Sequence, residues 1–270
     1  MEQKSFSSAK IAIICIEILA IAALAVSAMY FSSFLAIIGF SLLFWGAILL
    51  YLIPIKSNCD ILVSAAAQPA SENIERFLSQ NNLTQNGIYL STDYLNLNPG
   101  IFKKLRRLED VESAIVFIPS TTFTMQDSNS QIRVNLKDGV FFAPPGGALC
   151  RIIEQQLRKS FSLVLPYEFS AALSRVLAKE LRLVESIETK IEEDSANVKV
   201  TKSVFKMNCR DTDKQPQTHK QVGCLLSSSI ACALAKTINK PVIKENESQN
   251  SHGEIMQLQY KFLDNIHWVD

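Results

Sequence analysis

Six cysteines and three histidines are the residues of this 270-residue chain that could bind a metal or act as nucleophile and base. No two cysteines have the gap of two to four residues that is typical of structural zinc sites. Cys224 and Cys232 are eight positions apart in a helical pattern, about 12 Å along a helix, too far to share a metal. We therefore predict no metal site, no cofactor and no catalytic residue, and we interpret the cysteines as small buried side chains: Cys15, Cys59, Cys150, Cys209, Cys224 and Cys232.

A Pro/Gly loop is the first candidate ligand site. Pro144, Pro145, Gly146 and Gly147 precede a helical pattern, where unpaired backbone N–H groups can bind an anion. The loop lacks the Gly-Lys-Ser/Thr ending of a phosphate-binding loop. A rigid connection between a strand and a helix accounts for the same residues, so both interpretations stay open.

A basic cluster is the second candidate site. Lys103, Lys104, Arg106 and Arg107 could contact anionic lipid headgroups if the domain is held at a membrane. Acidic residues follow closely at positions 109, 110 and 112, which is typical of an ordinary solvated helix face.

The charge distribution excludes one class of function. The first 56 residues carry three lysines and two glutamates, and the rest of the chain balances 24 basic against 24 acidic residues. A nucleic-acid-binding domain normally shows a basic excess or stripe. We therefore expect no nucleic-acid partner.

Two apolar segments open the chain. Residues 11–31 contain one charged residue, Glu17, and residues 34–53 contain none. A helix of about 20 residues spans the hydrocarbon core of a bilayer. Since two serines separate the segments, we predict an antiparallel transmembrane hairpin within residues 1–56, with the lipid bilayer as a partner. Small residues in both segments would permit close packing: Ala20, Ala23, Ser27, Ala36, Gly39 and Gly46.

Lysines predict the orientation of this hairpin. Lys4, Lys10 and Lys56 flank its outer ends and its turn is uncharged, so both termini and the following domain are expected in the cytoplasm. A signal peptide is the alternative interpretation of the first segment, with residues 23–25 as a cleavage motif. The second span would then bring the domain to the same side of the cell membrane.

The remaining residues mix helical and strand patterns, which predicts a soluble α+β (mixed α/β) domain. It has a first region at 57–190 and a C-terminal strand–helix–strand–strand region at 191–270. We expect helices at 71–80, 103–110, 148–161, 166–183 (extending toward 194) and 222–239. We expect strands at 61–63, 88–90, 114–118, 131–136, 140–142, 197–207, 241–244 and 255–262, and polar loops at 121–130 and 245–252.

Two of these patterns are specific. Asp138-Gly139 suits a type I′ turn, so the strands on either side are expected to form a hairpin. The 222–239 segment is nearly uncharged, which predicts a helix that is buried on most sides.

Four segments carry a resemblance to a known family: Gly87-Ile88-Tyr89-Leu90, residues 116–120, Ala143–Gly146 leading to Glu154, and Gly223-Cys224 before an Ala/Ser-rich helix. Together they resemble a family of uncharacterised archaeal membrane proteins with two N-terminal spans. The resemblance implies this architecture and no activity. The family has a proline after its Tyr-Leu and Gly-Cys pairs, where this chain has Ser91 and Leu225.

The C-terminal third is also similar to small-ligand domains related to vinyl reductases. Cys209, Gly223 and Cys224, the following helix and Pro241-Val242 carry this likeness. Those domains have a further cysteine near the last strand, which residues 257–262 lack. The likeness implies a candidate pocket at Cys209, Gly223 and Cys224.

We therefore expect a non-enzymatic, cytoplasm-facing binding or sensing module, tethered to a membrane, that takes a protein partner or a small apolar ligand. A membrane-surface enzyme acting on lipid or through a thiol is the first alternative. An assembly subunit of a larger membrane complex is the second. The oligomeric state stays open.

Overall fold

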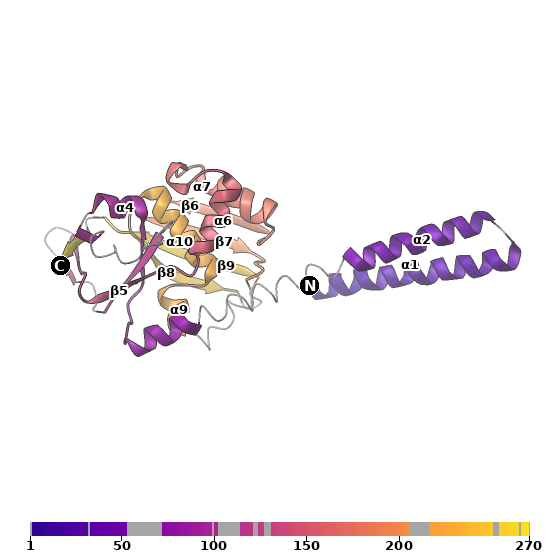
Figure 1. Ribbon diagram of the computed structural model, residues 1–270, viewed down its shortest axis with the longest axis horizontal. Coiled ribbons are helices and arrows are strands. Elements are labelled where there is room, and N and C mark those ends of the chain that lie inside the picture. Colours follow the sequence, from indigo (N-terminus) through magenta and orange to yellow (C-terminus); the bar gives the residue numbers. More distant parts are fainter. Residues whose placement is uncertain are drawn as a thin grey trace. The chain divides into compact units, whose positions relative to one another are not determined.

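A computed structural model of the chain describes residues 2–31, 33–52, 72–98, 100–101, 114–120, 124–126, 131–205, 216–250, 254–264 and 266–269 (Figure 1). The chain divides into two compact units, an N-terminal unit (Met1–Leu62) and a C-terminal unit (Val63–Asp270). The predicted strand at 61–63 and the predicted helix at 103–110 lie outside the described residues.

The N-terminal unit is a pair of packed helices, α1 (Glu2–Tyr30) and α2 (Ser33–Leu52). Small residues are buried where the two helices meet: Ala20, Ser27, Gly39 and Gly46. A Cβ atom at Gly39 would lie 2.7 Å from Leu24 Cγ, and one at Gly46 would overlap the Glu17 carboxylate. The helices can therefore approach closely, while their large apolar side chains, such as Ile18, point outward.

By length and composition, one described helical stretch could cross a membrane, Gln217–Ile238, and most of it is buried within the C-terminal unit. The apolar stretches described in α1 and α2 are shorter, Cys15–Tyr30 and Ser33–Ile48.

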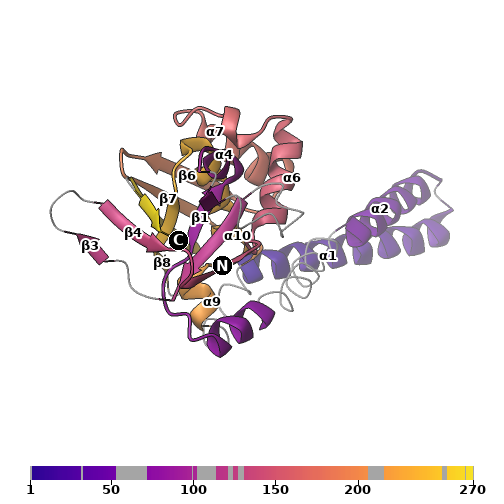
Figure 2. The ribbon, with the colours of Figure 1, turned by 60° about the vertical axis from the view of Figure 1, so that its left-hand side comes forward.

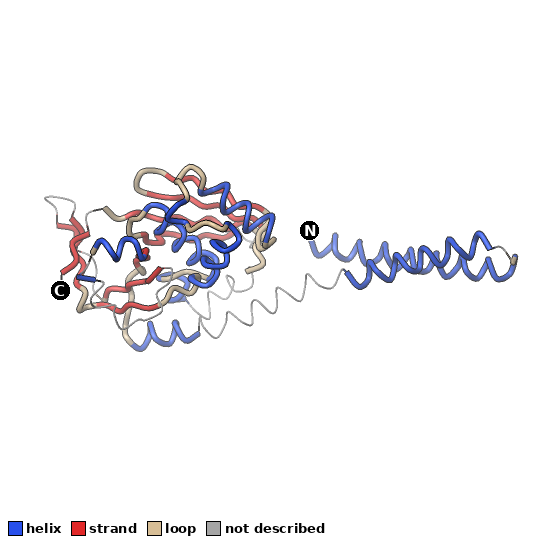
Figure 3. The backbone as a smooth tube through the Cα atoms, turned by 45° about the horizontal axis from the view of Figure 1, so that its top comes forward, coloured by secondary structure: helices blue, strands red, loops and turns tan. Residues whose placement is uncertain are grey.

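The C-terminal unit has mixed α+β content and is built on an antiparallel seven-stranded sheet (Figure 3). Its strands run in the order β5 (Gly139–Phe142), β2 (Ala114–Pro119), β1 (Ile88–Ser91), β8 (Val242–Gln249), β9 (Ile255–Phe262), β7 (Ser195–Thr201) and β6 (Ser186–Ile191). Both predicted regions, 57–190 and 191–270, contribute strands to this one sheet.

Helices cover one face of the sheet. The central helix α10 (Leu225–Ile238) contacts β1, β8, β2 and α6 (Gly147–Leu157). A 3-10 turn (Phe161–Leu163), α7 (Phe169–Leu173) and a π-helical segment, η2 (Ser174–Glu180), follow α6. A helix at 72–80, as predicted, and α9 (Pro216–Gln221) complete the helical elements near this face. The prediction of a buried helix is confirmed, because every residue from Leu226 to Lys236 is buried.

The opposite face is covered at one end. There lie α4 (Thr92–Leu97) and a small sheet of β10 (Ile266–Val269), β4 (Gln131–Asn135) and β3 (Thr124–Gln126), with β3 at its outer side (Figure 2). Residues of α4, β4 and β10 pack on β1 and β2. Phe117 of β2 meets Trp268 of β10 with ring centroids 5.7 Å apart. At the other end, β9 alternates buried residues with exposed Gln257 and Gln259, so this part of the face is open.

The predicted hairpin between β4 and β5 is wrong. β4 pairs with β3 and β10, whereas β5 pairs with β2. Asn135 accepts from the Lys137 N–H (2.9 Å) and donates to Asp138 (2.6 Å), which holds a local turn, but β5 pairs with β2 after it instead of returning to β4. Gly139 then lies against the Phe117 ring, where a Cβ atom would not fit.

Three other expectations were wrong. Residues 184–194 do not extend a helix, because Val184 and Ile187 are buried and β6 pairs with β7 across this segment. The expected loop at 121–130 contains β3. The expected loop at 245–252 belongs largely to β8, which continues to Gln249 by pairing with β9.

Replacing Leu234 by Asp should lower the free energy of unfolding of the C-terminal unit by at least about 4 kcal/mol, because an unpaired carboxylate would be buried in α10. The control is Leu97→Asp, at an exposed position, which should change it by no more than about 0.5 kcal/mol. Urea unfolding followed by circular dichroism measures both. An unchanged midpoint for Leu234→Asp would contradict the central position of α10.

Candidate functional site

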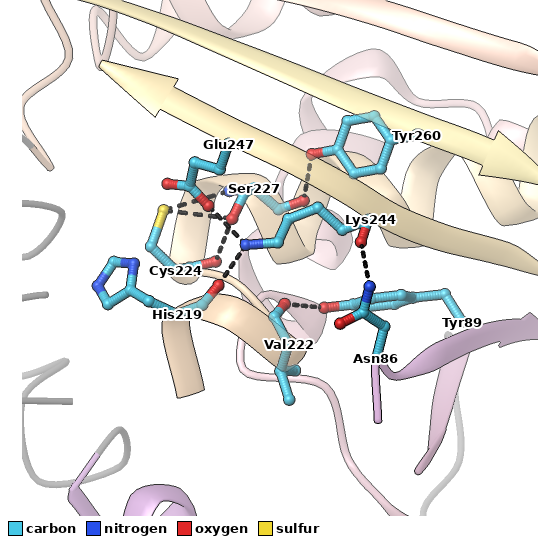
Figure 4. A network of polar contacts seen from close by, with 9 residues as sticks. All are labelled: Asn86, Tyr89, His219, Val222, Cys224, Ser227, Lys244, Glu247 and Tyr260. Carbon is cyan, nitrogen blue, oxygen red and sulfur yellow. Dashed lines mark hydrogen bonds and ion pairs between the residues drawn. The ribbon is translucent and has the colours of Figure 1, made fainter. Parts of the chain in front are cut away.

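The start of α10 gathers buried polar groups (Figure 4). Gly223 has φ +83°, a left-handed conformation that favours glycine, and a Cβ atom there would overlap Ser227 Oγ. Cys224 then caps the helix, its Sγ accepting from the Ser227 N–H at 3.4 Å. The Gly-Cys pair therefore sets the angle at which α10 leaves α9.

A buried ion pair lies beside this junction. Lys244 Nζ is 2.8 Å from Glu247 Oε2, and Lys244 is 3% exposed. The same ammonium donates to the backbone oxygen of His219, and the Lys244 carbonyl accepts from Asn86 Nδ2 at 3.1 Å. Lys244 thus ties β8 to α9 through its side chain and to the residues just before β1 through its backbone.

A β-bulge places both charges on the same side of the sheet. Residues three apart in a regular strand point to opposite faces. In β8 the register shifts between Lys244 and Asn246, so Lys244 opposes Tyr260 and Glu247 opposes Leu258, which are both buried. Asn246 opposes the exposed Gln259 and points to the other face.

Two buried tyrosines complete the network. The Tyr89 hydroxyl donates to the Val222 carbonyl, and the Tyr260 hydroxyl donates to the Ser227 carbonyl at 2.7 Å. Burial raises the pKa of both phenols well above the ordinary value, and the Glu247 charge raises that of Tyr260 further. Both side chains are therefore neutral hydrogen-bond donors across the physiological pH range.

This network holds elements in place more than it offers a reactive centre. His219 and Cys224 are both buried. Glu247 Oε1 is buried and has no hydrogen-bond partner among the residues that the structure describes. Within the same residues, no group of three His, Cys, Asp or Glu side chains could hold a metal ion.

A second buried ion pair joins α6 to α10. Lys236 Nζ lies 2.7 Å from Glu154 Oε1, and the same oxygen accepts from Ser160 Oγ (2.9 Å) and the Phe161 N–H (2.8 Å). Glu154 therefore compensates the one charge on the buried part of α10. It also fixes the start of the loop that follows α6.

The predicted Pro/Gly loop packs against α10. Gly146 donates its N–H to Ser228 Oγ at 3.0 Å, and a Cβ atom on Gly146 would overlap the Ser229 backbone. Pro144 and Gly147 are buried as well. The structure thus brings this loop and Gly223-Cys224 to the same end of α10. A role in anion binding stays a prediction.

The other predicted site residues lie outside the described residues. These are Cys209 of the candidate pocket and the basic cluster of Lys103, Lys104, Arg106 and Arg107. Of the cysteines that the structure describes, Cys150, Cys224 and Cys232 are buried and Cys15 is exposed. Burial raises the pKa of Cys150 to about 12 and that of Cys232 well above its ordinary value, so both are protonated thiols.

A groove of about 460 Å³ lies on the open part of the sheet, formed by β6, β7, β8 and β9 and bordered by Ser170 of α7. Strand pairing arranges its polar residues in two transverse rows. One row is Lys190, Asn197, Gln259 and Asn246, and the next is Glu188, Lys199, Gln257 and Ser248. We call these eight residues the polar groove.

Analysis of the sequence missed the polar groove. Its β8 residues fell in a segment expected to be a loop, and its β6 residues in a segment expected to be helical. The alternation of polar and apolar residues in 255–262 was the available signal. It identified a strand with one polar face but could not show which strands lie beside it.

Replacing Lys244 by Met should lower the free energy of unfolding by about 3–5 kcal/mol, because Glu247 would stay buried without its cation. The double variant Lys244→Met/Glu247→Met should regain most of this loss. The control is Lys240→Met, which removes a half-exposed pair with Asp264 and should cost less than about 1 kcal/mol. Urea unfolding of the full chain measures all three, and equal losses for both lysine variants would contradict the buried pair.

Comparison with known proteins identifies a family for the chain. The family model described as a domain of unknown function, DUF7982, matches residues 1–260. No curated protein and no solved structure matches the chain. The likeness to archaeal membrane proteins and to vinyl-reductase-related domains stays a prediction. Because the match covers both the helical pair and nearly all of the C-terminal unit, the chain belongs to the DUF7982 family.

Proposed function

We propose that the chain is a membrane-tethered binding module, in which α1 and α2 form a transmembrane hairpin. The outward-facing residues of both helices support the tether, because large apolar side chains are exposed along them, such as Leu19 and Phe40. The buried positions Ala20, Ser27, Gly39 and Gly46 recur seven residues apart on each helix, which suits two helices packing along one seam. Glu17, the charge in the first span, faces Gly46 of the other helix and is partly shielded from lipid.

We further propose that the C-terminal unit faces the cytoplasm. The three lysines flanking the hairpin and its uncharged turn support this orientation.

Two glycosylation acceptor patterns test the orientation, Asn82-Leu83-Thr84 and Asn246-Glu247-Ser248. Asn82 and Asn246 are both exposed, so a glycosylation enzyme could reach them if the unit were on the outer side. We expect both to be unmodified in protein from its native cells. Mass spectrometry of the corresponding peptides measures this, and sugar on either residue would place the unit outside.

The polar groove is the observation that carries the binding function. Its volume of about 460 Å³ is in the range of ligand pockets, and it lies where the small sheet stops covering the large one. A ligand pocket is usually apolar, whereas this lining is mainly polar. We therefore propose a polar ligand instead of a small apolar one.

The lining favours a protein segment. Asn197, Gln259, Asn246 and Gln257 each present a carboxamide, which offers donors and an acceptor together, as a peptide group does. The charges nearly balance, with Lys190 and Lys199 against Glu188. Four strands about 4.8 Å apart span about 14 Å, the length of about four extended residues. An extended, uncharged segment of a partner protein fits this spacing.

Peptide selection tests the groove. Random short peptides displayed on phage are selected against the full chain in detergent micelles, and we expect binders with Asn, Gln, Ser or Thr. The variant Asn197→Leu/Gln259→Leu should weaken their binding about tenfold or more, because two paired side chains are lost. The matched control is Gln155→Leu/Gln156→Leu on the exposed face of α6. Failure to select any binder, or equal loss in both variants, would contradict the groove as a binding site.

A further inference from the structure

An exposed apolar loop follows α6. Leu163, Leu165 and Tyr167 are 67%, 48% and 78% exposed, although they lie within five positions of one another. Other exposed large apolar residues in the described part of the C-terminal unit stand farther apart in the sequence, for example Phe77 and Leu97. Single exposed apolar residues are normal on a protein surface, whereas a cluster of three usually marks a contact.

Buried side chains and backbone hydrogen bonds hold this loop in place. Phe161, Val164 and Phe169 are buried between and beside the exposed residues, and the two phenylalanine rings lie 5.6 Å apart. The Phe161 backbone donates to Glu154 (2.8 Å) and accepts from Thr237 Oγ1 (3.2 Å). The exposed side chains are therefore presented by a fixed scaffold and cannot fold back into the core.

We infer that Leu163, Leu165 and Tyr167 insert into the headgroup region of a lipid bilayer and dock the C-terminal unit on the membrane surface. This inference rests on the tether of the proposed function. Leucine and tyrosine are typical of segments that sit at the interface between hydrocarbon and water. Exposed Arg158 precedes the loop and complements anionic headgroups, whereas the neighbouring Lys159 lies 3.5 Å from Glu168 in a half-exposed ion pair.

The tether formed by α1 and α2 explains why three exposed side chains suffice for docking on the membrane. Three side chains bury too little apolar area to hold a protein on a membrane from solution. When the chain is already anchored, docking is an intramolecular step at high effective concentration, so a weak contact is populated. Docking would also orient the polar groove, because Ser170 at its border lies three residues after Tyr167.

Photo-crosslinking tests the docking loop. The full chain is made with benzoylphenylalanine in place of Tyr167 and reconstituted into vesicles of phosphatidylcholine and phosphatidylglycerol. We expect phospholipid adducts at this position after irradiation, detected by mass spectrometry. The matched control carries the same probe at Leu97, which is 71% exposed in α4, and should give severalfold less adduct. Adding Leu163→Ser and Leu165→Ser to the Tyr167 probe should also lower the yield severalfold.

The outcomes separate the inference from the tether. Carbonate extraction of the same vesicles reports whether the chain is integral to the bilayer. Retention in the membrane with no lipid adduct at position 167, or with as much at position 97, would overturn the docking loop and leave the tether standing. A protein adduct at position 167 would assign the loop to a protein contact and would likewise overturn the inference. Release by carbonate would overturn the tether, and the docking loop with it.

Discussion

The burial of α10 on all sides is the constraint on which the C-terminal unit depends. A helix in this position must satisfy each of its polar groups inside the protein, because water cannot reach them. Its serines bond to the preceding turn or to the Pro/Gly loop, and Lys236 bonds to Glu154. The strands, α6 and the loop after α6 therefore surround α10 and supply the partners of its polar groups.

The bulge in β8 gives this sheet two different faces. Because one residue is inserted at Glu245, Lys244 and Glu247 both point toward α10, while Asn246 and Ser248 point toward the open side. The same irregularity thus completes the buried network and supplies two residues of the polar groove. A regular strand would have placed a charge in the groove and an unpaired charge in the core.

Local patterns in the sequence predicted much of the fold. Period-two alternation identified β9, and a long uncharged segment identified α10 as buried. Partnerships between strands could not be predicted, since β4 and β5 are joined by a hairpin-like turn yet belong to different sheets. Charge was also misleading at Glu247, which was expected in a loop, because its buried pair with Lys244 is recognisable only when both partners are seen together. Candidate sites were predicted at the Pro/Gly loop, at the basic cluster and at Cys209, Gly223 and Cys224. The polar groove was missed because it depends on four strands that are distant in sequence.

The edge strand β6 affects how neighbouring copies of the protein can meet. Edge strands can pair with one another, and charged side chains hinder such pairing. β6 presents Glu188 and Lys190, and Lys190 pairs with Glu192 at 2.7 Å just beyond the strand. At the other edge, the Phe77 ring lies 6.5 Å from that of Phe142 in β5. Under the proposed membrane tether, confinement to a plane would make sideways collisions between copies frequent. The charges of β6 and the helix beside β5 both hinder such collisions from starting a growing sheet.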